Sequence, residues 1–151
     1  MWAGVKYNYM KNILFKVFSI ITLRILMGFI FLWAFLDKTF GLGVATPADK
    51  AWIAGGSPTT GFLSNAVQGP FATFFNSLAG VPAVDWLFMI GLLFVGVTLL
   101  LNKYVKWGAV AGAVMLVLMY LAVLFPENNP LVDDHIVYAV LLGYIALHSK
   151  R

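Results

Sequence analysis

The chain has 151 residues, of which 62% are hydrophobic and only 11% are charged. Soluble domains carry roughly 25% charged residues, so this composition excludes an ordinary soluble domain and indicates that lipid solvates much of the chain. The net charge of +4 would suit a nucleic-acid binder, but the basic residues stand at the ends of apolar runs, as membrane anchors do. The absence of cysteine excludes disulfides, thiol relays, iron–sulfur ligation and thiolate metal sites.

Four apolar segments predict an all-α fold, a four-transmembrane-helix bundle that forms one domain over residues 1–151. The first run, Val17–Leu36, contains Arg24, exceeds the apolar part of a signal peptide and precedes no small-residue cleavage site, so we expect a retained helix. The short connections 102–106 and 126–129 predict antiparallel neighbours. The predicted spans cover about residues 15–38, 83–102, 105–125 and 130–149.

Charge asymmetry predicts a multi-pass orientation in the cell membrane with both termini on the cytoplasmic side. All six acidic residues then fall on the outer side, and Lys38 and Lys50 are the basic residues of the outer segments. Arg24 lies inside the first span. The cytoplasmic segments hold the other basic residues: Lys6, Lys11, Lys16, Lys103, Lys106, Lys150 and Arg151.

Residues 41–81 form a long outer connection that is nearly uncharged and rich in Gly, Pro, Ser and Thr. Phe71, Phe74, Phe75 and Leu78 recur at helical spacing within it, which predicts a short amphipathic helix on the membrane surface or over the mouth of the bundle. Because structureless loops of this length are uncommon, we expect the segment to form an outer cap.

Two local motifs refine the predicted helices. Asn129 is a suitable N-cap for the last span, with Pro130 at its first helical position. Gly108 and Gly112 form a GxxxG pair on the third span, a spacing that lets another helix backbone approach closely.

Polar side chains gather at the predicted outer ends of the first and fourth spans. If these spans pack together, Asp37 and Lys38 lie at the depth of Asp134 and His135, and Tyr138 shares a helix face with Asp134. Reduction of a membrane quinone needs protons, so Asp37, Asp134 and His135 are the candidate catalytic residues. The alternative interpretation makes them ordinary helix-end acids and an interfacial Asp37–Lys38 ion pair.

The candidate quinone-binding residues are Arg24, Trp33, Lys38 and Tyr138. Arg24 lies about 10 Å inside the first apolar run, where it either snorkels to the inner interface or takes a functional role. Trp33 stands close to the outer end of the same span. Lys38 would contact an anion or a quinone oxygen, with Asp37 orienting it.

The two histidines of the chain are the candidate axial ligands of a haem. His135 and His148 stand thirteen residues apart on one predicted helix, which separates them by about 20 Å. One chain therefore cannot supply two axial histidines, and we expect no haem, iron–sulfur or metal site. Quinone is the expected cofactor, acting as a substrate.

Four segments, considered in their order along the chain, resemble the DoxX/DoxD-like family of small four-helix membrane proteins. The resemblance implies a role beside redox or stress-defence proteins, and its DoxD branch is linked to the membrane subunit of a thiosulfate:quinone oxidoreductase. By resemblance, the site residues would be Arg24, Asp37, Lys38, Asp134 and His135. The segments are 23–28 (LRILMG), 35–38 (FLDK), 55–63 (GGSPTTGFL) and 128–135 (NNPLVDDH).

These observations lead to two hypotheses. The first is a membrane subunit of a quinone-linked oxidoreductase that passes electrons from a small extracytoplasmic reductant, with thiosulfate as one candidate, to membrane quinone. The second is a non-enzymatic scaffold that docks a redox or stress-defence partner through the GxxxG face or the outer cap. Membrane lipid and quinone, together with a partner subunit or a second copy, are the expected partners, and no nucleic acid is expected.

Overall fold

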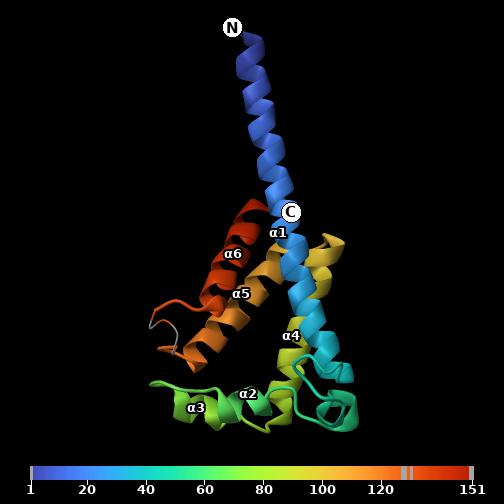
Figure 1. Ribbon diagram of the computed structural model, residues 1–151, viewed down its shortest axis with the longest axis vertical. Helices are drawn as coiled ribbons and strands as arrows, with labels where there is room; N and C mark the ends of the chain where they lie inside the picture. Colours follow the sequence, from blue (N-terminus) through green and yellow to red (C-terminus); the bar gives the residue numbers. More distant parts are fainter. Residues whose placement is uncertain (1, 127–128, 130, 150–151) are drawn as a thin grey trace.

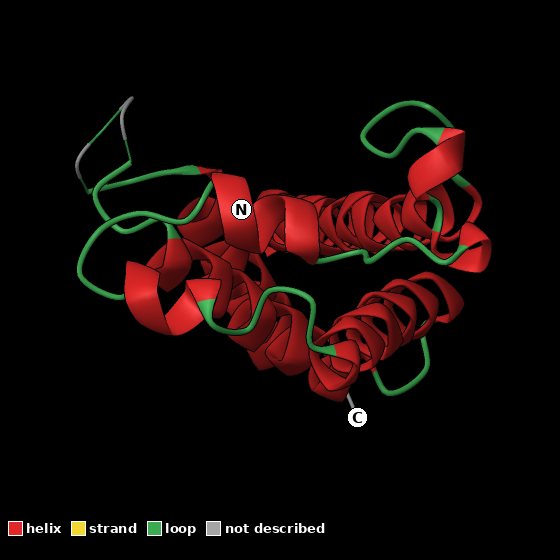
Figure 2. Ribbon diagram, turned by 90° about the horizontal axis from the view of Figure 1, so that it is seen from below, coloured by secondary structure: helices red, strands yellow, loops and turns green. Residues whose placement is uncertain are grey.

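The computed structural model describes residues 2–126, 129 and 131–149, with the backbone alone for 2–17. All of its named elements are helical, which confirms the all-α prediction (Figures 1 and 2). Six α-helices and two short 3-10 turns follow one another along the chain. They are α1 (Trp2–Phe40), η1 (Ala48–Lys50), η2 (Trp52–Ala54), α2 (Thr60–Asn65), α3 (Ala72–Asn76), α4 (Pro82–Leu101), α5 (Val105–Ala122) and α6 (Asp134–His148).

Among the described residues, three helices are long and apolar enough to cross a membrane: Phe18–Phe40 of α1, Pro82–Leu101 and Val105–Ala122. These three helices are compatible with a multi-pass membrane protein. The apolar helix α6 has 15 residues, a length of about 22 Å at the α-helical rise, which is shorter than the usual hydrocarbon thickness.

The last helix begins later than the predicted residue 130, and Asn129 is not its N-cap. The Asn129 side chain instead accepts hydrogen bonds from the backbone N–H groups of Leu131 and Val132, which forms a turn. Asp133 takes the N-cap position, because its carboxylate accepts the N–H of Ile136 at 3.1 Å. Pro130 lies outside the described residues.

The four longest helices form a ring. Helix α1 packs against α4 and α6, and α5 packs against the same two helices. Figure 1 shows the N-terminal part of α1 extending beyond the other helices, while α2 and α3 lie across the opposite end. Figure 2, seen from that end, shows the long connection lying over the helix ends. The centre of the ring is apolar, with Met89, Val95, Leu99, Leu142 and Ile145 fully buried.

Glycines set the closest approaches between these helices. A Cβ atom added to Gly96 would lie 2.8 Å from the backbone nitrogen of Leu32. The backbones of α1 and α4 are therefore in direct contact at this point, which only a glycine allows. The GxxxG pair is also internal: a Cβ at Gly108 would meet Thr98, and one at Gly112 would meet Leu142 at 2.8 Å. Since both glycines are buried inside the chain's own ring, the GxxxG face is not open to a partner, which corrects that part of the scaffold hypothesis.

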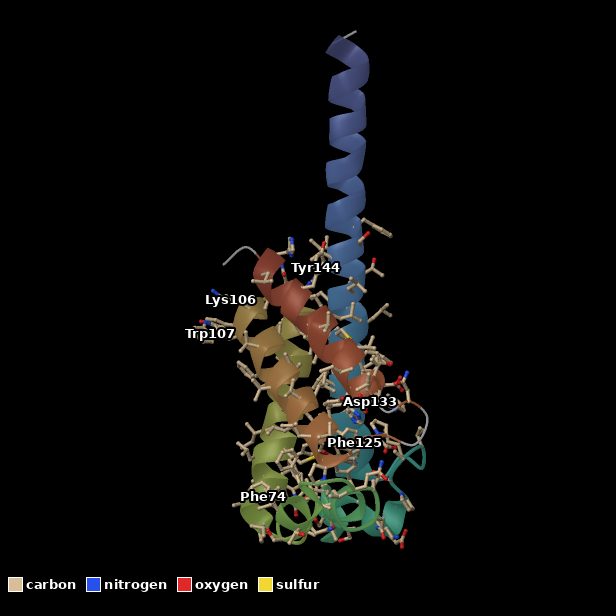
Figure 3. The ribbon with its side chains drawn as sticks, turned by 90° about the vertical axis from the view of Figure 1, so that its left-hand side faces the viewer. Phe74, Lys106, Trp107, Phe125, Asp133 and Tyr144 are labelled. Atoms are coloured by element: carbon tan, nitrogen blue, oxygen red, sulfur yellow. The ribbon has the colours of Figure 1, made fainter. Side chains whose placement is uncertain are left out.

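The connection 41–81 is held to the bundle along much of its length. The backbone N–H of Gln68 donates to the Ala122 carbonyl, and its side-chain amide donates to the carbonyl of Phe125. In the segment 71–78, where the sequence predicts an amphipathic helix, the structure has the five-residue helix α3 (Ala72–Asn76), which includes neither Phe71 nor Leu78. Figure 3 shows that Asp133, Phe125 and Phe74 lie toward this cap end, while Lys106, Trp107 and Tyr144 lie toward the other.

Candidate functional site

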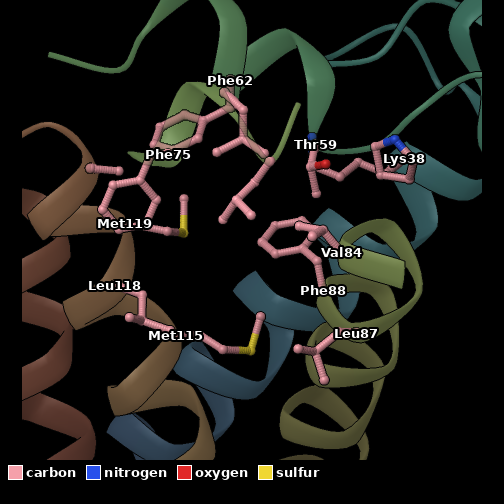
Figure 4. Close-up of a pocket in the computed structure, with 14 residues that line it drawn as sticks. Lys38, Thr59, Phe62, Phe75, Val84, Leu87, Phe88, Met115, Leu118 and Met119 are labelled. Atoms are coloured by element: carbon pink, nitrogen blue, oxygen red, sulfur yellow. The ribbon is translucent and has the colours of Figure 1, made fainter. Parts of the chain in front are cut away.

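A pocket of about 340 Å³ lies beneath the cap, between α4 and α5 (Figure 4). Its walls are almost entirely apolar, and Lys38 is the single charged residue among them. Ligand pockets commonly have a volume of about 300–1,000 Å³ and combine apolar walls with a few polar groups, so this cavity suits a small apolar ligand. The lining residues are Lys38, Pro58, Thr59, Phe62, Leu63, Phe75, Leu78, Val84, Leu87, Phe88, Met115, Leu118, Met119 and Ala122.

Lys38 stands in the last turn of α1 and reaches one end of this pocket, beside Thr59 (Figure 4). Within the described part of the chain, its ammonium forms no hydrogen bond or ion pair, although the neighbouring Asp37 attracts it electrostatically. An ammonium at the edge of an apolar cavity can donate hydrogen bonds to a ligand oxygen.

Asp37 holds the cap in place. Its carboxylate is 2% exposed and accepts the backbone N–H groups of Val44 at 3.2 Å and Ala45 at 3.1 Å. These bonds fasten the turn that follows α1. The Asp37 carboxylate therefore binds the backbone of residues 44–45. The sequence had instead predicted that Asp37 orients Lys38.

Asp85, in the first turn of α4, makes a second and denser connection to the cap. Its buried carboxylate accepts hydrogen bonds from the Ser57 hydroxyl at 2.9 Å and from the Thr59 N–H and hydroxyl at 3.1 and 2.6 Å. The Ser57 hydroxyl in turn accepts the N–H and hydroxyl of Thr60. Sequence reasoning missed Asp85 as a site residue, because its hydroxyl partners lie more than twenty positions earlier in the chain.

Replacing Asp85 with alanine is expected to loosen residues 57–60 and to destabilise the cap by about 1–3 kcal/mol, because buried donors would lose their acceptor. Hydrogen exchange of this segment in the purified protein should accelerate. Asp49→Ala is the matched control, since Asp49 lies exposed in η1 of the same cap. Equal exchange rates in the two variants would show that Asp85 does not hold the segment.

At the start of α6, His135 pairs with Asp133 rather than with Asp134. The His135 Nδ1 lies 2.6 Å from the Asp133 carboxylate, and since a carboxylate can only accept, the imidazole donates. Burial alone would raise the pKa of Asp133, but the hydrogen bonds from His135 and from the Ile136 N–H outweigh it and hold that pKa below its ordinary value. Asp134 is exposed.

His135 also lies next to the pocket wall. Its ring centroid is 6.5 Å from that of Phe62, whose side chain lines the cavity. The predicted juxtaposition of the outer ends of the first and fourth spans therefore holds in part, with His135 behind one wall and Lys38 at one end. Asp133 stands shortly before the apolar run that begins at Ile136, and an aspartate in this position is typical of a helix N-cap. This is the sequence signal that could have identified Asp133.

The remaining candidate residues lie away from the pocket lining. Arg24 donates from its guanidinium to the backbone carbonyl of Leu99, which fastens α1 to the far end of α4. Trp33 stacks on Phe29 with ring centroids 6.0 Å apart. Tyr138 is partly buried and packs against the apolar core of the ring.

The fold and the pocket together define a helical protein with three membrane-compatible helices and an apolar ligand cavity. Within the ranges that the structure describes, no group of three or more His, Asp or Glu side chains could hold a metal ion. Comparison of the chain with protein-family models, with characterised proteins and with solved structures found no match.

Proposed function

We propose that this chain is a membrane subunit of a quinone-linked oxidoreductase and that the quinone headgroup binds in the pocket beneath the cap. The observation that supports the proposal is an apolar cavity whose single charged lining residue, Lys38, lies at one end. Such a cavity favours an uncharged ring that carries hydrogen-bond acceptors, and a quinone has this chemistry. The resemblance to the DoxX/DoxD-like family points to the same class of ligand.

In this proposal α6 is a fourth span, the cap faces the outside of the cell, and both termini are cytoplasmic. The bilayer thins locally around α6, which accommodates its 15 residues at a modest cost. Phe71, the N-cap of α3, and Phe74 within α3 are exposed and absent from the pocket lining, and in this proposal they lie at the membrane surface as the aromatic residues of an amphipathic helix would.

The proposed reaction transfers two electrons and two protons to the quinone, which becomes a quinol. A small extracytoplasmic reductant supplies the electrons; with thiosulfate, two dianions join through a new S–S bond and release two electrons. Lys38 hydrogen-bonds the quinone oxygen on which negative charge develops. His135, held by Asp133, carries protons toward the pocket wall at Phe62.

The test begins with the purified protein, which should retain quinone that organic solvent extracts and ultraviolet spectroscopy identifies. Asp133→Asn should lower the rate of quinone reduction by about tenfold, because His135 loses the charge that orients it. Asp134→Asn is the matched control, one residue further along and exposed, and should leave the rate unchanged. Absence of quinone, or equal rates in the two variants, would count against the proposal.

The exposed aromatic side chains Phe71 and Phe74 also favour the second function, a scaffold that binds a redox or stress-defence partner through the cap. A scaffold would co-purify with that partner from mild detergent. Its function would not change in Lys38 or His135 variants, which distinguishes it from the oxidoreductase subunit.

A further inference from the structure

The pocket has one buried side and one open side. Pro58, Thr59 and Leu63, which belong to the cap, are buried where they line it. Leu87 of α4 and Leu118 of α5 line it as well, yet their side chains are 75% and 49% exposed. These two leucines therefore form the rim of an opening between α4 and α5.

The rim lies on two of the three helices that are long and apolar enough to cross the bilayer. Leu87 is five residues inside α4 and Leu118 is four residues before the end of α5, about 6–8 Å from the cap ends of these helices. On the cap side, Phe62 and Phe75 cover the cavity (Figure 4). The water-facing side of the pocket is thus roofed by aromatic rings, and the open side faces the surroundings of α4 and α5.

The wall next to the rim can adapt to a ligand. Gly91 of α4 faces Met115 of α5, and a Cβ atom at Gly91 would lie 2.6 Å from the Met115 sulfur. The missing side chain leaves room for this unbranched methionine, which lines the pocket. Methionine changes rotamer easily and fits apolar ligands of varied shape, so Met115 can move aside at the opening.

From this geometry we infer that the ligand enters sideways from the bilayer, between Leu87 and Leu118, and that its apolar tail remains in this opening. The inference rests on the proposed function and specifies its substrate class. The quinone is a lipid-dissolved one whose tail extends into the membrane, while its ring lies near Lys38.

The test uses the absence of cysteine from the chain, which makes a single introduced cysteine the only site for a thiol label. Leu118→Cys, Val110→Cys and Ser64→Cys are prepared in the full chain, reconstituted in lipid nanodiscs and labelled with a bulky maleimide. Val110 lies on the same helix, exposed and outside the pocket, and Ser64 lies exposed on the cap. The exchange rate of a long-tailed quinone, loaded through the lipid, is measured for each.

The label at residue 118 should slow quinone exchange by about tenfold or more, whereas labels at residues 110 and 64 should leave it unchanged. A labelled Leu87→Cys variant should repeat the slow exchange from the opposite side of the opening, which guards against misfolding of one variant. Slow exchange with the label at residue 64 and normal exchange at 118 and 87 would overturn sideways access while leaving the proposed function intact. No quinone binding in the unlabelled protein would overturn both.

Discussion

Lys38→Met is expected to lower the rate of quinone reduction by about a hundredfold, since losing one preorganised donor to a developing oxyanion costs roughly that much. Methionine retains much of the apolar stem of lysine and removes the ammonium. In an apolar cavity the electrostatic effect of this group is far larger than in water. Lys38 is the single charged residue in the pocket lining, and the hydroxyl of Thr59, which also lines the pocket, already donates to Asp85.

Lys50→Met is the matched control for this variant. Lys50 lies exposed in η1 of the cap and is not part of the pocket lining, so its loss removes the same charge without touching the pocket. Reduction rates and quinone content are measured in both purified variants, with gel filtration to verify that each is folded. A Lys38→Met protein with the unsubstituted rate and quinone content would refute the role of the ammonium.

Gly96→Leu is expected to separate α1 from α4 and to cost about 3 kcal/mol or more in stability. The new Cβ atom would lie 2.8 Å from the backbone nitrogen and 2.9 Å from the Cα atom of Leu32. Backbone atoms cannot rotate aside as a side chain can, so one helix must shift. The shift would also displace the end of α1 that carries Lys38.

Gly143→Leu provides the comparison, because a Cβ atom at Gly143 would meet nothing within 4 Å. Thermal unfolding of the detergent-solubilised proteins, followed by gel filtration after heating, should show a much lower midpoint for the Gly96 variant. Similar midpoints for the two variants would mean that the α1–α4 contact is looser than this packing indicates.

The pocket could be anticipated only in part from the sequence. Lys38 was predicted as a binding residue because a lysine at the outer end of an apolar span is conspicuous, and it does line the cavity. Asp37, Arg24 and Asp134 stand out in the sequence for the same kind of reason, but charge alone does not reveal the partner of a side chain. The backbone N–H groups of residues 44–45 and the Leu99 carbonyl, which bind the first two, carry no sequence signal.

The apolar walls were harder to foresee. Phe62, Phe88 and Met115 are unremarkable in a chain that is 62% hydrophobic, and only their convergence beneath the cap distinguishes them. The cap itself was expected from its length and composition. Its attachment through Asp85 depends on hydroxyl groups that reach α4 only after the connection has folded back.

The sequence by itself determined the helical class and the positions of three membrane-compatible helices, because long apolar runs satisfy their backbone hydrogen bonds only as helices in lipid. The predicted end of the first span and both predicted ends of the second and third spans lie within three residues of the observed helix ends, whereas α1 begins at Trp2 and α6 at Asp134, away from the predicted starts. The tertiary structure alone decided which helices touch, which acids hold the cap, and that Lys38 faces a cavity. Such contacts join residues far apart in the chain, and their energies depend on three-dimensional packing that no local pattern encodes.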